Sequence, residues 1–130
     1  MQIRPAKVED PIKIIDVLKA GLGEASIKIN RRFWEFKHKE NPFGKSLVLV
    51  AKKDHRIAGV RAFMKWRWQI NQTVWQAYRA VDTATHPDFQ RQGIFKKLTL
   101  AALDQIAEKS ECFVFNTPVS YTHLTLPTKA

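Results

Sequence analysis

The sequence lacks several features that define whole classes of protein. It contains a single cysteine among 130 residues, which argues against a secreted fold held together by disulfides. No apolar run approaches the ~20 residues of a membrane-spanning helix, and the amino terminus has no apolar stretch typical of a signal peptide. We therefore expect a cytoplasmic protein without a membrane partner. Cys112 lies in an apolar run and is expected to be a buried structural thiol.

Acidic residues are also scarce. The chain has 12 Asp and Glu against 22 Lys and Arg, which gives a formal net charge of +10, so a polyanionic ligand has to be considered. One class that fits is a non-enzymatic nucleic-acid or anion-binding module that uses Arg31, Arg32 and Lys37. The basic residues are scattered, however, and they do not alternate with aromatic residues as in proteins that bind single strands. We expect no nucleic-acid partner.

The spacing of apolar residues predicts a mixture of strands and helices. Residues 47–53, 56–70 and 74–85 are rich in apolar and β-branched residues and are separated by short polar turns, which is typical of an antiparallel meander. Helical spacing predicts a first helix that begins at Pro11, and a second one that Ser26 caps, with Ile29, Phe33 and Phe36 on its apolar side. A short first strand covers residues 1–6.

The segment around residues 86–98 is expected to turn a strand into a helix. Pro87 disfavours helix at the residue before it, and Gly93 lets another molecule approach the backbone. Apolar residues then recur at helical spacing for about four turns from near Gln92. A helix start has unpaired N–H groups and the positive end of the helix dipole, so this turn is a candidate anion site. An ordinary connection with a basic first turn remains the alternative.

A fifth strand, residues 112–116, follows this helix and would lie parallel to the fourth strand. The predicted fold class is therefore α/β (α+β), with a mixed, mostly antiparallel sheet and helices on both faces.

The same segment resembles the acetyl-coenzyme A motif of the GNAT (GCN5-related) N-acetyltransferase superfamily. Thr85, His86 and Pro87 match the end of the motif's strand, and residues 90–95 match its Gln/Arg-x-x-Gly-x-Gly/Ala turn. Two positions depart from the pattern: Arg91 stands where glycine is frequent, and Phe95 stands where glycine or alanine is usual. The side chain of Phe95 must therefore point away from the phosphates.

The resemblance implies a function and a set of binding residues. The protein would transfer an acetyl group from acetyl-CoA, as co-substrate and without a metal, to an amine or hydroxyl. In the family the pantetheine arm pairs with the edge of the fourth strand where the fourth and fifth strands splay apart. The implied cofactor-binding residues are Thr83, Ala84, Thr85, Gln90, Arg91, Gln92, Gly93, Ile94, Phe95 and Asn116.

The catalytic residues stay unassigned. Asp82 and His86 are candidate bases near the end of the fourth strand, but each is also explained as a residue without a catalytic role. His38 and His55 are expected to be solvated. In the family the acid is frequently a Tyr on the helix after the fifth strand, a part that this chain is expected to lack.

The acceptor is implied only loosely. Residues 33–37, followed by Asn41-Pro42-Phe43-Gly44, resemble a GNAT subgroup met in bacterial surface-polysaccharide gene sets, and in the superfamily the first two helices border the acceptor pocket. A small-molecule or surface-sugar amine is therefore a candidate acceptor. The alternative is that Phe33, Trp34 and Phe36 simply belong to the core.

The last residues differ in character from the rest. Residues 119–128 resemble the conceptual translation of a transposon-based sequencing adapter, and such segments are excluded from fold reasoning. We therefore expect residues 1–118 to form a truncated acyl-CoA N-acyltransferase domain that stops after its fifth strand, and residues 119–130 to be a non-native tail. A fragment of this kind is expected to be inactive or impaired.

Overall fold

The computed structural model describes residues 1–23, 30–108 and 112–116. The elements follow one another as β1 (Gln2–Pro5), α1 (Pro11–Leu22), α2 (Arg31–His38), β2 (Leu47–Lys53), β3 (Arg56–Ile70), β4 (Thr73–Thr85), a short 3₁₀ helix (Pro87–Phe89), α3 (Ile94–Ala107) and β5 (Cys112–Phe115). The five strands form one sheet in the order β1-β2-β3-β4-β5. Neighbouring strands are antiparallel except β4 and β5, which are parallel. The mixed, mostly antiparallel sheet predicted from the sequence is confirmed.

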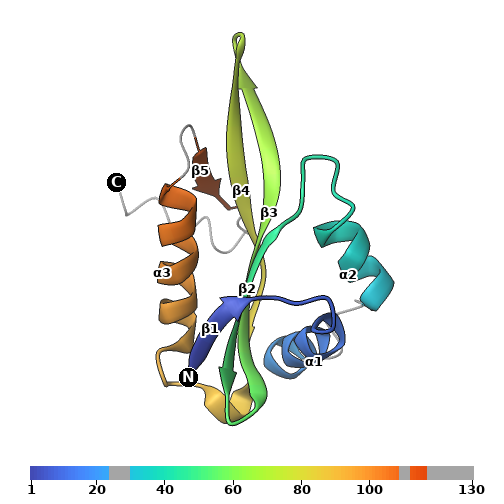
Figure 1. The fold of residues 1–130 in the computed structure, drawn as a ribbon, viewed down its shortest axis with the longest axis vertical. Helices are drawn as coiled ribbons and strands as arrows, with labels where there is room; N and C mark the ends of the chain where they lie inside the picture. The colour runs from blue at the N-terminus through green and yellow to red at the C-terminus, as the bar shows by residue number, and fades with distance from the viewer. Residues whose placement is uncertain (24–29, 109–111, 117–130) are drawn as a thin grey trace.

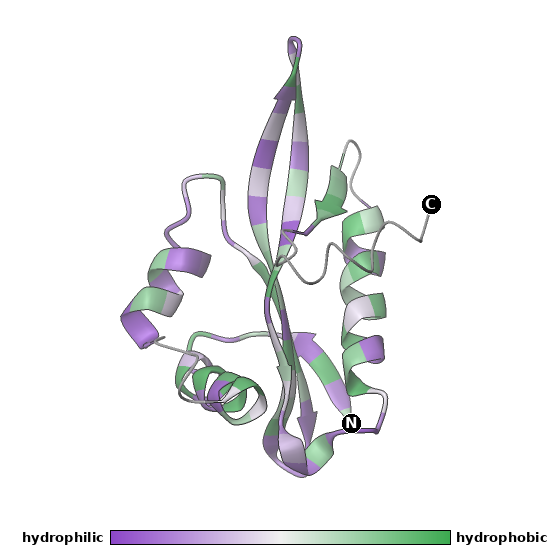
Figure 2. Ribbon diagram, turned by 180° about the vertical axis from the view of Figure 1, so that it is seen from behind, coloured by the Kyte–Doolittle hydropathy of each residue, from purple (hydrophilic) through white to green (hydrophobic). Residues whose placement is uncertain are grey.

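Tight turns fix the register of the meander. Asp54 and His55 join β2 to β3 with φ of +53° and +61°, and Asn71 has φ of +56° between β3 and β4. Short polar residues tolerate this left-handed conformation in hairpin turns. The β3–β4 hairpin extends well beyond the helices (Figure 1), and its strands carry alternating hydrophilic and hydrophobic bands (Figure 2). Two-faced strands of this kind place one set of side chains on each side of the sheet.

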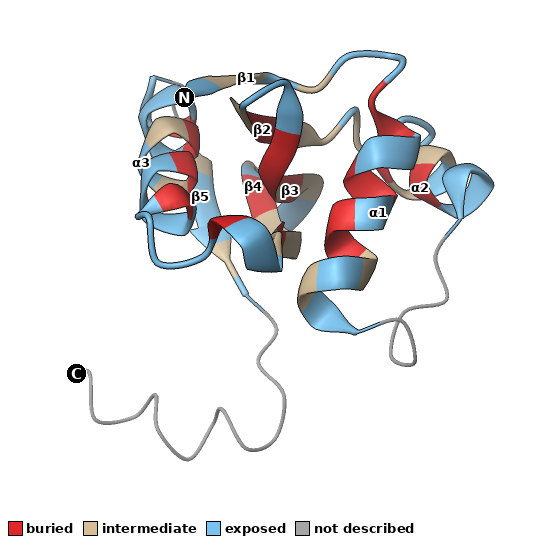
Figure 3. Ribbon diagram, turned by 90° about the horizontal axis from the view of Figure 1, so that it is seen from below, coloured by how far each residue is buried: buried red, intermediate tan, exposed pale blue. Residues whose placement is uncertain are grey.

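Helices cover both faces of the sheet (Figure 1). On one face α1 and α2 bury an apolar cluster that includes Ile14, Leu18, Trp34 and Val60. On the opposite face α3 packs through Ile94, Leu98, Ala102 and Ile106 against Leu49, Phe63 and Tyr78. Figure 3 shows the buried sides of α1 and α3 turned toward the strands between them. The predicted three-layer arrangement is therefore confirmed.

Two glycines allow the helices to approach the sheet closely. A Cβ atom on Gly59 of β3 would lie 2.8 Å from Ile94 Cγ2 of α3, and one on Gly21 of α1 would lie 2.9 Å from Ala84 Cβ of β4. Both spacings are too short for real carbon contacts. Each helix therefore rests directly on backbone, and the start of α3 and the end of β4 are held in place by packing.

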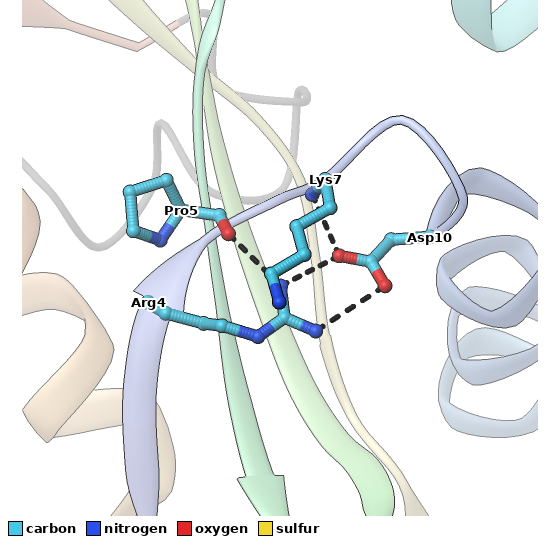
Figure 4. A network of polar contacts seen from close by, with 4 residues as sticks. All are labelled: Arg4, Pro5, Lys7 and Asp10. Carbon is cyan, nitrogen blue, oxygen red and sulfur yellow. Dashed lines mark hydrogen bonds and ion pairs between the residues drawn. The ribbon is translucent and has the colours of Figure 1, made fainter.

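A buried ion pair positions the start of α1 (Figure 4). The Asp10 carboxylate lies 2.7 Å from Arg4 Nη1 of β1 and accepts a 2.7 Å hydrogen bond from the Lys7 backbone N–H. Burial opposes ionisation of this group, but these hydrogen bonds outweigh it and lower the pKa of Asp10 below its ordinary value of 3.8. Asp10 thus links β1 to α1, although its side chain makes no capping bond to the helix.

We expect Asp10→Asn to lower the free energy of unfolding at pH 7 by about 1–3 kcal/mol, because it leaves the partly buried Arg4 guanidinium without its carboxylate. The native pKa of Asp10 is depressed, so its contribution is present above pH 3.8 and disappears as the pH falls through the lower native pKa. Urea denaturation of both proteins at pH 7 and at pH 3 checks this. A difference between the two proteins that stays constant with pH would contradict it.

None of the helices within the described ranges is long and apolar enough to cross a membrane.

Candidate active site

A β-bulge interrupts β4 close to its carboxyl end. Arg61 pairs with Thr83 while Ala62 pairs with Val81, so Asp82 has no partner on β3. Its φ is +32°, a conformation that side-chain-bearing residues avoid at a cost of about 1–2 kcal/mol. Bulges bend a strand and redirect a side chain, and they are frequent beside active sites. The bulge places Asp82, whose backbone is strained, next to the strand residues predicted to bind the cofactor.

β4 and β5 pair over a short length. Residues 76–79 of β4 pair with Cys112–Phe115 of β5, and beyond Arg79 the described residues of β5 provide no further partner. The stretch that contains Thr83, Ala84 and Thr85 is therefore bonded on one side to β3 and presents its other edge toward the end of β5. Asn116 follows directly after β5. The predicted strand residues thus lie along an edge that can bond to an extended ligand.

Hydrogen bonds and packing hold the turn after β4 against the sheet. The His86 backbone N–H donates to the Ala58 carbonyl at 2.8 Å, and His86 Nδ1 accepts from the Asp88 N–H at 3.1 Å. Phe89 is buried in the core on the α3 side of the sheet. These contacts connect the turn to the sheet on both sides of Pro87 and fix where the next helix starts.

The helix start itself is open. α3 begins at Ile94, two residues after the position predicted from the sequence, and Gly93 precedes it with φ of +76° and no side-chain cap. A Cβ atom on Gly93 would meet nothing within 4 Å. The first N–H groups of an α-helix have no partner within the helix, so here they are directed toward open space with the positive end of the helix dipole.

A cavity of about 470 Å³ lies over this helix start. It is lined by Thr85, Phe89, Gln90, Arg91, Gly93, Ile94, Phe95 and Lys96. Arg91, which also has a positive φ of +64°, and Lys96 are exposed and bring positive charge. No acidic side chain is among these lining residues. The Asp88 carboxylate, in the turn before the helix, pairs with Arg56 at 3.0 Å. The cavity therefore has the charge and donors for a phosphate group.

The structure brings six of the ten predicted cofactor-binding residues to this cavity. Thr83 and Ala84 lie on the adjoining strand, where Ala84 is buried against α1 and Thr83 Oγ1 donates to the Val60 carbonyl at 3.1 Å. Gln92 turns away, because its side chain bonds to Lys53 Nζ. Asn116 follows β5.

Phe95 lies against Arg61 beside the helix start. Its side chain is half exposed and lies over Arg61, with the guanidinium carbon 5.0 Å from the ring centroid. The same guanidinium lies 4.9 Å from the ring of Phe63. Arg61 is thus held between two aromatic rings, and burial lowers its pKa. This stacking holds the side chain of Phe95, which stands where glycine or alanine is usual, beside the turn.

The two candidate bases differ in their surroundings. Asp82 Oδ2 is 2.8 Å from His38 Nε2 and 2.9 Å from Lys37 Nζ. Burial opposes ionisation of this carboxyl, but the two hydrogen bonds prevail and lower its pKa. His86 uses Nδ1 within the turn. An Asp with a depressed pKa is a weak base at neutral pH, so Asp82 is better suited to holding other groups in place.

His38 was expected to be solvated, and that prediction is wrong. Its side chain is 2% exposed, its ring centroid lies 4.1 Å from that of Trp34, and Nδ1 is 2.7 Å from Ser46 Oγ. Charged neighbours on the helix suggested a solvated face, but Trp34 and His38 are four residues apart and share its buried side. This i,i+4 spacing was the signal that could have identified His38. His55, by contrast, is exposed in its turn as predicted.

α2 presents aromatic side chains to solvent instead of burying them. Asn30 caps this helix by accepting the Phe33 N–H at 2.8 Å, while the predicted cap Ser26 and Ile29 lie outside the described residues. Phe33 and Phe36 are 50% and 67% exposed and Trp34 is buried, so of these three aromatic residues only Trp34 belongs to the core. The interpretation of all three as core residues is wrong.

A second cavity, of about 410 Å³, lies between α2 and the β3–β4 hairpin. Its walls are mostly aromatic and apolar, with a few charged groups at the edge: Phe33, Phe36, Lys37, Glu40, Asn41, Pro42, Phe43, Met64, Trp66 and Arg79. Lys37, which lines this cavity, also binds Asp82. The same contact therefore connects this aromatic cavity to the bulge of β4.

Cys112 is half-buried, so the expectation of a fully buried thiol is only partly met. Within residues 1–23, 30–108 and 112–116, no group of three or more His, Cys, Asp or Glu side chains is arranged to hold a metal ion.

Comparisons with known structures agree with this geometry. A transcriptional regulator from Bacillus halodurans shares 20% identity at a TM-score of 0.72, over 98% of this chain and 88% of that one. A predicted acetyltransferase from Clostridium acetobutylicum, solved with acetyl-CoA, shares 13% at 0.70, over 99% and 88%. An aminoglycoside acetyltransferase from an uncultured soil metagenomic sample, in complex with sisomicin, shares 21% at 0.70, over 98% and 84%. These likenesses show the fold.

No protein with a curated description matches the sequence. The family comparison is decisive: the model of the acetyltransferase (GNAT) domain matches residues 2–125, nearly the whole chain. The chain therefore belongs to the GNAT acetyltransferases.

Proposed function

We propose that the protein transfers an acetyl group from acetyl-CoA to an amine carried on a sugar-like ring. The observation that carries the first half of this proposal is the open, uncapped start of α3 at Gly93, which adjoins the strand edge of β4. A diphosphate fits the cavity there, and an extended amide-containing arm fits the edge. The structural neighbour solved with acetyl-CoA supports the choice of donor.

Backbone N–H groups would make most of the contacts with acetyl-CoA. The pyrophosphate would accept hydrogen bonds from the amides at the start of α3, with Arg91 and Lys96 adding charge. The pantetheine arm would run along residues 83–85, where a backbone N–H polarises the thioester carbonyl. The amine nitrogen then attacks the carbonyl carbon of the thioester, and the C–S bond breaks. The nitrogen loses a proton to water, and the departing thiolate takes up a proton.

The aromatic cavity beside α2 suits the acceptor. Phe33, Phe36 and Trp66 offer apolar faces on which the C–H side of a sugar ring can pack, and Glu40 and Arg79 at the edge can bond to its polar groups. An amine held on such a ring would face β4 through the Lys37 side of the cavity. The aminoglycoside acetyltransferase among the structural neighbours is solved in complex with sisomicin, which supports an amino sugar as the acceptor class.

Calorimetry with acetyl-CoA and with a short single-stranded oligonucleotide separates this function from the nucleic-acid alternative. We expect acetyl-CoA to bind with a dissociation constant between about 1 μM and 1 mM, and the oligonucleotide to bind weakly at physiological salt. Titration of the oligonucleotide at two salt concentrations reveals binding driven by phosphate contacts. Salt-dependent binding of the oligonucleotide without a response to acetyl-CoA would contradict the enzyme proposal.

A further inference from the structure

A network of polar side chains runs between α2 and the face of the sheet that α2 covers. It runs from Ser46, just before β2, through His38 in the last turn of α2, to Asp82 in the bulge of β4. The two bonds measure 2.7 Å and 2.8 Å, and His38 between them is 2% exposed. Buried polar groups with complete hydrogen bonding fix one arrangement of the elements they join. This network therefore fixes how the carboxyl end of α2 sits over the sheet.

Asp82 is the point where this network reaches the proposed reaction site. It precedes Thr83 directly, and its positive φ is retained although it is unfavourable. The bonds from Lys37 and His38 to its carboxylate compensate for that strain, because they exist only when the bulge directs the side chain toward α2. The strained conformation and the α2 contacts therefore support each other.

Lys37 connects the network to the aromatic cavity. Its ammonium binds Asp82 at 2.9 Å, and its side chain lines the same cavity as Phe33 and Phe36. Phe36 and Phe33 lie one and four residues before Lys37 on α2, and neither is held by burial. The position of this aromatic wall relative to β4 thus depends on the contacts that Lys37 and His38 make with Asp82.

We infer that Asp82 is a positioning residue for the acceptor: by binding Lys37 and His38 it holds the aromatic cavity of α2 against the bulge of β4, so that the acceptor amine meets the thioester. This inference rests on the proposed function. It assigns Asp82 to the acceptor side of the reaction, whereas the cofactor side depends on backbone donors around Gly93. The two sides should therefore respond separately to mutation.

The test compares Asp82→Asn with the wild-type protein. Calorimetry gives the dissociation constant of acetyl-CoA, and mass spectrometry follows acetylation of glucosamine, a ring-bearing amine, at saturating acetyl-CoA. Mass detection is preferable to a thiol reagent because Cys112 would also react. We expect acetyl-CoA affinity to stay within about twofold, and KM for glucosamine to rise at least about tenfold, since the neutral Asn amide lacks the negative charge that holds the Lys37 ammonium.

Two further variants separate positioning from folding. Lys37→Met should reproduce the rise in KM and Lys37→Arg should restore most of the wild-type value, because Arg can still pair with Asp82. Glu35→Gln removes the surface ion pairs of Glu35 with Arg31 and Lys39 and should leave KM unchanged. Thermal unfolding is recorded for each variant.

The outcomes are distinct. Loss of acetyl-CoA affinity in parallel with the rise in KM, or no change in KM, would overturn the positioning role. A wild-type protein that binds acetyl-CoA but does not acetylate glucosamine would overturn the acceptor assignment and this inference with it. A wild-type protein that does not bind acetyl-CoA would instead refute the proposed function itself.

Discussion

Gly93→Glu should abolish measurable binding of acetyl-CoA. The new side chain would enter open space, because nothing lies within 4 Å of the Gly93 Cβ position, and its carboxylate would lie beside the amides that we assign to the pyrophosphate. Repulsion between like charges at close range opposes binding of the pyrophosphate. We expect a loss in affinity of about a hundredfold or more, or about 2.7 kcal/mol, measured by calorimetry.

Gly93→Gln is the matched control. Both variants place a side chain of the same size at φ of +76°, so both lose about 1–2 kcal/mol of stability from backbone strain. They differ in charge alone, and Gln should therefore retain much more affinity than Glu. Equal affinities for the two variants, or an undiminished affinity for Glu, would show that the phosphates bind elsewhere.

Gly59→Val should have the largest effect on stability. A Cβ atom at this position would already lie 2.8 Å from Ile94 Cγ2 and 3.3 Å from Leu98 Cδ1, and the two methyl groups of valine add to the overlap. Overpacking of a close-packed core costs about 1–3 kcal/mol. We expect a loss near the upper end of that range in urea denaturation, together with weaker binding of acetyl-CoA, because α3 must shift and its first turn carries the phosphate donors.

A second substitution in α3 tests the cause. Ile94→Ala removes the atom that would collide with the introduced valine side chain, so the Gly59→Val/Ile94→Ala protein should be more stable than the sum of the two single effects predicts. Strict additivity of the two losses would mean that the clash between β3 and α3 is not what destabilises the single variant.

Much of the fold and of the helix start at the candidate site could be predicted from the sequence because the signals are local. Gly93 after a polar turn, with apolar residues at helical spacing beyond it, predicted the start of α3 within two residues. The turns at Asp54 and Asn71 and the apolar runs between them predicted the meander. In each case the property that decides the structure belongs to a few adjacent residues.

The acceptor side could not be predicted in the same way. The bulge at Asp82 arises from the register between β3 and β4. Register depends on both strands together, so the sequence of either strand alone does not reveal the bulge. The burial of His38 depends on Asp82 and Ser46, which are 44 and 8 residues away. Phe33 and Phe36 have a spacing that suits a core as well as an exposed wall, and only the position of α2 over the sheet decides between them.

The order of the strands has a consequence for how the protein forms during synthesis. Each strand lies beside the one made immediately before it, so the sheet can extend at its growing side as the polypeptide leaves the ribosome. The β1–β4 framework, with the Asp82 network, can assemble before α3 has been translated. The protein would then become able to bind a nucleotide cofactor only late, when α3 packs against the strands that have already formed.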